Sequence, residues 1–217
     1  MSCAVSSVTT SPTPTRRAVL ARRVRLLVGG VIVYNVVEGA VAIVAGTLAS
    51  SIALVGFGLD SVVEVVSALA ITWQFAAADH ERREQTALRV VSVSFFLLAA
   101  YVGVQSVVTL SSSADVQHST VGIVLAAVSL VVMPTVSWAE RRAGRELGSA
   151  SVVADSRQTL LCTYLSAVLL VGLVLNSTLG WAWADPLAAL VIAAAAVREG
   201  RRAWGGDTCC AGTALSR

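Results

Sequence analysis

Six apolar runs, each long enough to cross a lipid bilayer, constrain this chain more than any other feature. They cover Leu26 to Leu48, Ile52 to Ala77, Ala87 to Leu110, Thr120 to Trp138, Val152 to Asn176, and Trp181 to Val197. A spanning helix needs about 20 mostly apolar residues. Backbone polar groups in lipid must be paired internally, and these runs are too long and too continuous for barrel strands. The sequence therefore predicts an all-α membrane protein with six transmembrane helices.

Composition and charge placement support the same topology. The mean hydropathy is +0.77 and 13% of residues are charged, against about 25% in soluble domains. All 16 basic residues are Arg. They lie before the first run, around the second and fourth connections, within the fifth run and after the sixth, and the other three connections contain none. The positive-inside rule then predicts that both termini are cytoplasmic. We expect a multi-pass protein of the plasma membrane.

The expected domain organisation follows from these runs. Residues 1–25 form a basic tail rich in Ser, Thr and Pro, which we expect to be disordered. Residues 26–204 form the membrane domain, and residues 205–217 form a short cytoplasmic tail. No phosphate-binding loop, nucleotide motif or nucleophile with a base is visible, so we expect neither an enzyme nor ATP hydrolysis. We expect the lipid bilayer as a partner and no nucleic acid.

Polar side chains inside the runs are informative, because a charge at membrane depth costs on the order of a few kcal/mol. Asp60 and Glu64 are four residues apart and share one helix face. Two close anions in a low dielectric need a cation between them or a proton on one of them. That requirement suits a transporter that exchanges a divalent metal for protons. The alternative is a structural pair bonded to Arg157 or to helix hydroxyls.

The fifth run has a second polar face. Asp155, Gln158 and Cys162 share it at i, i+3 and i+7, and carboxylate, amide and thiolate are all metal donors. The alternatives are a buried structural Cys, a Gln bonded to a neighbouring helix and an Asp paired with Arg at the interface.

Three further polar residues are candidates for supporting roles. Asn35 and Glu38 lie one turn apart and are candidates for supporting the site or relaying protons. Asp185 precedes Pro186, a position favoured for capping its own helix, with a supporting or proton-coupling role as the alternative.

With these residues in view, the region from Leu26 to Trp204 resembles the cation diffusion facilitator family of divalent-metal transporters. SSIALVGFGLDSVVEVVSALA is similar to the family's second helix, where two ligands four residues apart form half of the metal site. Asp60 and Glu64 fall on these ligand positions. WAWADPLAALVIAAAAVREG resembles the sixth helix, and SASVVADSRQTLLC resembles the start of the fifth. The resemblance implies a divalent cation as substrate, zinc first, with cadmium, cobalt, manganese or iron as the other candidates.

The fifth helix departs from the family pattern. Aligning Ala154 and Asp155 with the family's Ala-Asp places Gln158 on the usual metal-binding His and Cys162 on the usual second Asp. The resulting ligand set is softer and less charged than one His with three Asp, and Asp155 is a candidate for the missing anion. The family's cytoplasmic C-terminal metal-binding domain is expected to be absent. The resemblance thus implies a divergent branch, with a homodimer as one candidate assembly.

The leading hypothesis is a secondary transporter that exports a divalent cation in exchange for protons. Its metal ligands would be Asp60 and Glu64, with Cys162 and either Asp155 or Gln158. Two alternatives stay open: a membrane scaffold or subunit that binds metal without transport, and a transporter of another small cation. The scaffold predicts metal binding without flux, whereas a carrier of organic cations predicts a roomier aromatic-lined cavity, and only 6% of this chain is aromatic.

Overall fold

A computed structural model describes residues 14–75, 80–112, 116–147 and 150–205, and these residues form six helices. The helices are α1 (Pro14–Ala49), α2 (Ile52–Phe75), α3 (His80–Ser112), α4 (Thr120–Leu147), α5 (Ala150–Leu179) and α6 (Ala184–Trp204). Each contains one of the predicted apolar runs, apart from residues at the run ends. The prediction of an all-α fold with six helices is confirmed.

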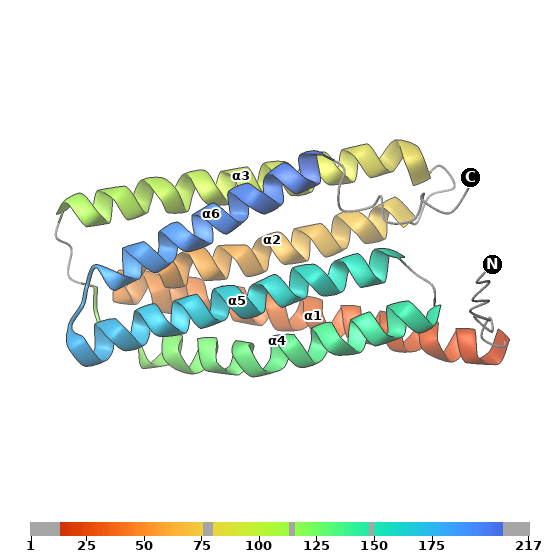
Figure 1. Cartoon of the computed structure of the whole chain (residues 1–217), viewed down its shortest axis with the longest axis horizontal. Helices are drawn as coiled ribbons and strands as arrows, with labels where there is room; N and C mark the ends of the chain where they lie inside the picture. Colours follow the sequence, from red (N-terminus) through yellow and green to blue (C-terminus); the bar gives the residue numbers. More distant parts are fainter. Residues whose placement is uncertain (1–13, 76–79, 113–115, 148–149, 206–217) are drawn as a thin grey trace, which may run out of the picture.

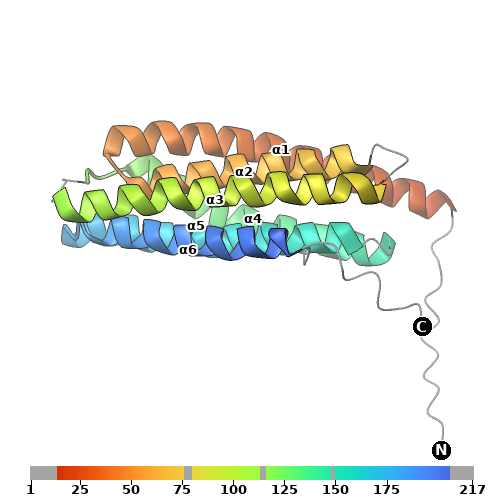
Figure 2. The ribbon, with the colours of Figure 1, turned by 90° about the horizontal axis from the view of Figure 1, so that it is seen from above.

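The helices run up and down and form two layers of three (Figures 1 and 2). One layer contains α1, α2 and α3, and the other contains α4, α5 and α6. Across the layers α1 packs on α4, α2 on α5 and α3 on α6. The central helix α2 also contacts α1, α3 and α6. Polar side chains on α2 are therefore positioned to meet groups from both layers.

The outer surface of the bundle is apolar, as lipid contact requires. Five helices include segments long and apolar enough to cross a membrane, by length and composition: Leu26–Ala49, Ile52–Ala70, Gln85–Ser111, Thr120–Ala143 and Thr159–Leu179. The helix α6 falls outside this set, and its last turns contain Arg198, Glu199, Arg201 and Arg202. It nevertheless packs along α3 as part of the same bundle. The chain is thus a multi-pass helical membrane protein whose sixth helix has a charged end.

The five tryptophans lie at two levels along the helices, judged from their positions in the sequence. Trp181 and Trp183 are exposed and stack at 5.1 Å where α6 begins. Trp73, Trp138 and Trp204 are exposed near the other end. At about 1.5 Å per residue they lie roughly 30 Å from the first residues of α2, α4 and α6, which matches the hydrocarbon core of a bilayer. This spacing is that of two interfacial tryptophan belts.

The helices extend beyond the apolar runs. The helix α1 begins at Pro14, about three turns before the first run. The basic segment before Leu26 is therefore largely helical where the tail was expected to be disordered, because an existing helix is easily extended by residues of ordinary propensity. The rest of the two predicted tails lies outside the described residues, at 1–13 and 206–217.

Asp185 has a different partner from the one predicted. It is fully buried in the first turn of α6 and provides no cap for that helix. Its carboxylate instead accepts hydrogen bonds from the Ser51 hydroxyl (2.5 Å) and the Ala53 backbone N–H (3.2 Å). These groups belong to the start of α2, whose first N–H groups have no partner within the helix. Asp185 thus ties α6 to the first turn of α2.

Replacing Asp185 by Ala should lower the unfolding free energy by about 2 to 3 kcal/mol. The change leaves a buried hydroxyl and a buried N–H without a charged acceptor. Thermal unfolding in detergent micelles, followed by circular dichroism, measures the effect. Thr178→Ala at the same end is the control, because Thr178 is exposed and bonds only to its own helix. Equal unfolding midpoints for the two variants would contradict this structural role.

Candidate metal site

The helix α2 places two carboxylates in the interior of the bundle. Asp60 is 5% exposed and Glu64 is 9% exposed. One helical turn separates them, so both face the same side of α2. The Asp60 carboxylate has no hydrogen bond or ion pair to any residue that the structure describes. Buried carboxylates are normally paired with donors or cations, so Asp60 is an exception that calls for a ligand.

A small cavity lies against Asp60 and Glu64. Its other polar walls are Cys162 of α5 and Glu199 of α6, and Phe95, Leu161, Leu165, Ala195 and Ala196 complete the lining. The cavity volume is about 20 Å³, which is room for one water or one ion without its hydration shell. Three of the five predicted metal ligands therefore line one cavity: Asp60, Glu64 and Cys162.

Close approach of α1 and α2 sets the position of the neighbouring polar groups. A Cβ on Gly39 would lie 3.0 Å from the Gly58 carbonyl oxygen, and a Cβ on Gly58 would lie 2.9 Å from the Ala42 Cβ. The two glycines therefore let the helix backbones approach closely. This approach brings Asn35 and Glu38 of α1 within hydrogen-bond reach of α2.

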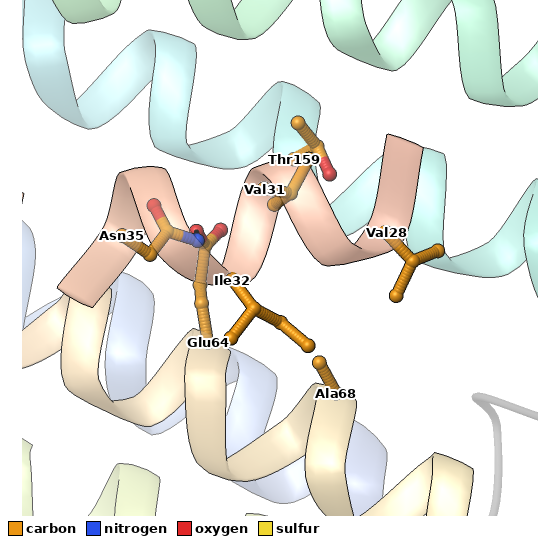
Figure 3. Close-up of a pocket in the computed structure, with 7 residues that line it drawn as sticks. All are labelled: Val28, Val31, Ile32, Asn35, Glu64, Ala68 and Thr159. Atoms are coloured by element: carbon orange, nitrogen blue, oxygen red, sulfur yellow. Dashed lines mark hydrogen bonds between the residues drawn. The ribbon is translucent and has the colours of Figure 1, made fainter. Parts of the chain in front are cut away.

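Asn35 fixes the orientation of Glu64. Its Nδ2 donates a hydrogen bond to Glu64 Oε2 at 2.7 Å. Figure 3 shows the two side chains meeting between α1 and α2, beside a second cavity of about 20 Å³ that is also lined by Thr159. Asn35 is 1% exposed, and its Oδ1 has no hydrogen-bond partner in the described part of the chain. Glu64 lines both cavities.

Glu38 is held apart from this cavity by neutral donors. Tyr34 donates to Glu38 Oε1 at 2.9 Å, and Ser61 donates to Glu38 Oε2 at 3.0 Å. The residue is 1% exposed and does not line the cavity described above. Its two oxygens already have partners, which fits a supporting role better than direct metal binding.

Two predicted ligands lie outside what the structure describes. Asp155 and Gln158 belong to α5, but their side chains are not among the described ones. Among the described side chains, no three His, Cys, Asp or Glu groups are close enough together to hold a metal ion. The cavity is therefore lined by Asp60, Glu64 and Cys162, but their side chains do not converge on one point.

Sequence reasoning missed two buried or half-buried acids near the predicted cytoplasmic ends of helices. Glu199 lines the cavity, and Glu140 of α4 is 1% exposed and accepts a hydrogen bond from Thr159 at 3.1 Å. Both stand beside arginines, so the sequence suggested only a solvated charged end. The helical spacing of Glu199 from the small residues Ala195 and Ala196 was the available signal.

Comparisons with known proteins bear on the whole membrane region. Residues 28–203 match the family model described as the cation efflux transmembrane domain. This chain belongs to the cation efflux family. The resemblance to cation diffusion facilitators is confirmed.

Two curated proteins illustrate the relationship. The uncharacterized transporter sll1263 of Synechocystis is 28% identical over 153 residues, which cover 66% of this chain and 49% of that protein. The cation-efflux pump FieF of Shewanella oneidensis is 32% identical over 144 residues, which cover 62% and 47%. The chain spans about half the length of the curated relatives it matches.

Burial of Cys162 predicts slow alkylation. The residue is 1% exposed, and a buried thiol reacts only when the surrounding helices open. In a variant with Cys3, Cys209 and Cys210 replaced by Ser, N-ethylmaleimide should modify Cys162 at least about tenfold more slowly than an exposed thiol. Ser111→Cys in a fully Cys-free background supplies that exposed thiol, since Ser111 is exposed near the end of α3. Equal rates would place Cys162 on the surface and remove it from the cavity.

Proposed function

We propose that this chain is a secondary transporter that exports a divalent metal cation in exchange for protons. The cation binds between α2 and α5, with Asp60 and Glu64 as ligands and with Cys162 and either Asp155 or Gln158 completing the set. The observation that carries the proposal is the buried Asp60 carboxylate, which faces a cavity the size of one ion and has no partner in the described part of the chain.

The charge of the site favours a divalent cation. Two carboxylates beside a small buried cavity repel each other, and one divalent ion neutralises both. Without the ion, protons must supply the compensating charge. Metal binding therefore expels protons and protonation expels the metal, which makes the site an exchanger of metal for protons.

The donor chemistry favours a borderline or soft metal. A thiol beside two carboxylates suits zinc or cadmium better than magnesium or calcium, which prefer oxygen ligands alone. Zinc is therefore the first candidate, followed by cadmium, with cobalt, manganese and iron after them.

The arginines and the family support the proposed direction and topology. The ends of the helices that hold the Arg clusters are cytoplasmic by the positive-inside rule, and the chain lies in the plasma membrane. The name of the Shewanella relative, a cation-efflux pump, supports movement from the cytoplasm outward. Rocking of the α1–α2–α3 layer against the α4–α5–α6 layer would expose a site between α2 and α5 to one side and then the other.

Asp60→Asn should abolish divalent cation flux. The substitution keeps the size of the side chain and removes the charge that the cation must balance. Zinc uptake into proteoliposomes under an imposed pH gradient measures the effect. Glu146→Gln is the matched control, because Glu146 is an acid at the proposed cytoplasmic end that pairs with Arg142 at 3.4 Å and lines neither site cavity.

Three results would each contradict a different part of the proposal. Unchanged zinc flux in Asp60→Asn would remove Asp60 from the pathway. Zinc binding without flux in the native chain would favour a metal-binding scaffold instead. Flux that does not respond to the pH gradient would refute proton exchange alone.

Cys162→Ser should weaken cadmium binding far more than manganese binding. Thiolate is a strong ligand for soft cations and contributes little to hard ones. Competition titrations of the purified protein with both metals measure the difference, and cobalt reports the thiolate directly through its charge-transfer absorption. Met133→Leu is the control, because Met133 is a buried sulfur residue (1% exposed) outside the cavity. Equal losses for cadmium and manganese would show that the thiol is not a ligand.

A further inference from the structure

Glu199 of α6 contributes a third carboxylate to the cavity of Asp60 and Glu64. Its side chain is 17% exposed, although it lies only about one turn before the end of α6 at Trp204. An acid at such a position normally extends into solvent. Here Glu199 forms part of the cavity wall. Its helix, α6, is the one that falls outside the five apolar spanning segments, and its last turns are charged.

Packing between α3 and α6 holds Glu199 at the cavity. The Ser92 hydroxyl of α3 donates a hydrogen bond to the carbonyl of Gly200, the next residue, at 2.7 Å. A Cβ on Gly200 would lie 3.1 Å from Phe96 and 3.2 Å from Phe95, so glycine permits this close approach. Phe95 also lines the cavity. The backbone beside Glu199 is therefore fixed against α3 and is not part of a loose helix end.

Arg202 is the present partner of Glu199. Its Nη1 donates to Glu199 Oε1 at 2.8 Å, and its own side chain is 43% exposed. A pair with one partner this exposed is screened by solvent and contributes little. A divalent cation in the cavity would bind Glu199 more strongly than Arg202 does, because Asp60 and Glu64 already favour positive charge there.

The number of donors supports a role for Glu199 in binding. An ion that fills a cavity of about 20 Å³ has lost most of its water, so protein groups must replace those ligands. Zinc-like ions usually have four. In the proposed function Asp60, Glu64 and Cys162 would supply three once the helices close on the ion, and Glu199 is the other polar residue that lines the described cavity. It would share the remaining coordination with Asp155 or Gln158.

We propose that Glu199 is a further ligand of the transported divalent cation and that Arg202 holds it in the cation-free state. The inference deepens the proposed function and depends on it. Cation entry draws Glu199 away from Arg202 and closes the cavity on the side of α6. Release returns Glu199 to Arg202, which prevents an uncompensated carboxylate from remaining beside Asp60.

Cadmium titration of the purified full chain in detergent tests the ligand role. Glu199→Gln should lower cadmium affinity at least about tenfold, the scale expected when a metal site loses a supporting group or more. Glu199→Asp, which keeps the carboxylate, should recover part of that loss. Glu146→Gln is the matched control and should bind as the native chain does, because Glu146 also pairs with an Arg of its own helix but lines neither site cavity.

A double-mutant cycle tests the part played by Arg202. Arg202→Gln should raise cadmium affinity by about threefold, as expected for loss of a weak competing ion pair. It should have no effect when Glu199 is already Gln, because the two residues act through one contact. An Arg202→Gln effect that persists in the double variant would overturn the competition.

Failure of this inference is distinguishable from failure of the proposed function. Native affinity in Glu199→Gln, together with lost binding in Asp60→Asn, would overturn the role of Glu199 and leave the transport site intact. Native affinity in both variants, or no cadmium binding by the native chain, would overturn both. If Glu199→Gln does not elute as a folded protein, Glu199→Asp and Arg202→Gln decide the question by the same titration.

Discussion

The compensation of buried negative charge governs this bundle. Three acids in the helix interior illustrate it: Glu38 accepts from Tyr34 and Ser61, Asp185 accepts from Ser51 and Ala53, and Asp60 has no donor in the described part of the chain. The first two are satisfied by groups that fold with them. Asp60 requires a mobile cation or a proton, because a buried carboxylate without compensation is strongly destabilising. The same requirement that makes Asp60 costly to the fold makes it suited to cation exchange.

The helix arrangement places the Asp60 carboxylate on α2, which contacts helices of both layers. The helix α2 contacts α1, α3, α5 and α6, so a ligand on α2 is within reach of side chains from most of the bundle. At the end where α2 begins, polar contacts tie separate elements together: Asp185 bonds to Ser51, and Gln117 N–H bonds to the Ala49 carbonyl at 2.9 Å. The described ion pairs of the opposite end each join residues of a single helix. At that end too a hydrogen bond crosses the layers, because the Ser92 hydroxyl of α3 donates to the Gly200 carbonyl of α6 at 2.7 Å.

Apolar length and arginine placement predicted the six helices, and a four-residue spacing predicted the shared face of Asp60 and Glu64, because both signals are local. The partner of Asp185 could not be predicted in this way. Its hydrogen bond to Ser51 spans 134 residues, and the local pattern before Pro186 favoured a cap on its own helix. Glu199 was missed for a related reason. Its arginine neighbours mark a solvated helix end, and only the packing of Gly200 on Phe95 and Phe96 brings it to the cavity.

The position of Glu199 also bears on the unusual fifth helix. The family pattern that this chain resembles combines one His with three Asp, whereas α5 has Gln158 and Cys162 at the corresponding positions. Counting Asp60, Glu64 and Glu199, the cavity still has three carboxylates. The number of carboxylates in the family pattern is thereby kept, although one of them comes from α6 instead of α5. Under the proposed function softness and charge would have separate sources: Cys162 would favour a thiophilic metal, and the three acids would set the strength of its attraction and its competition with protons.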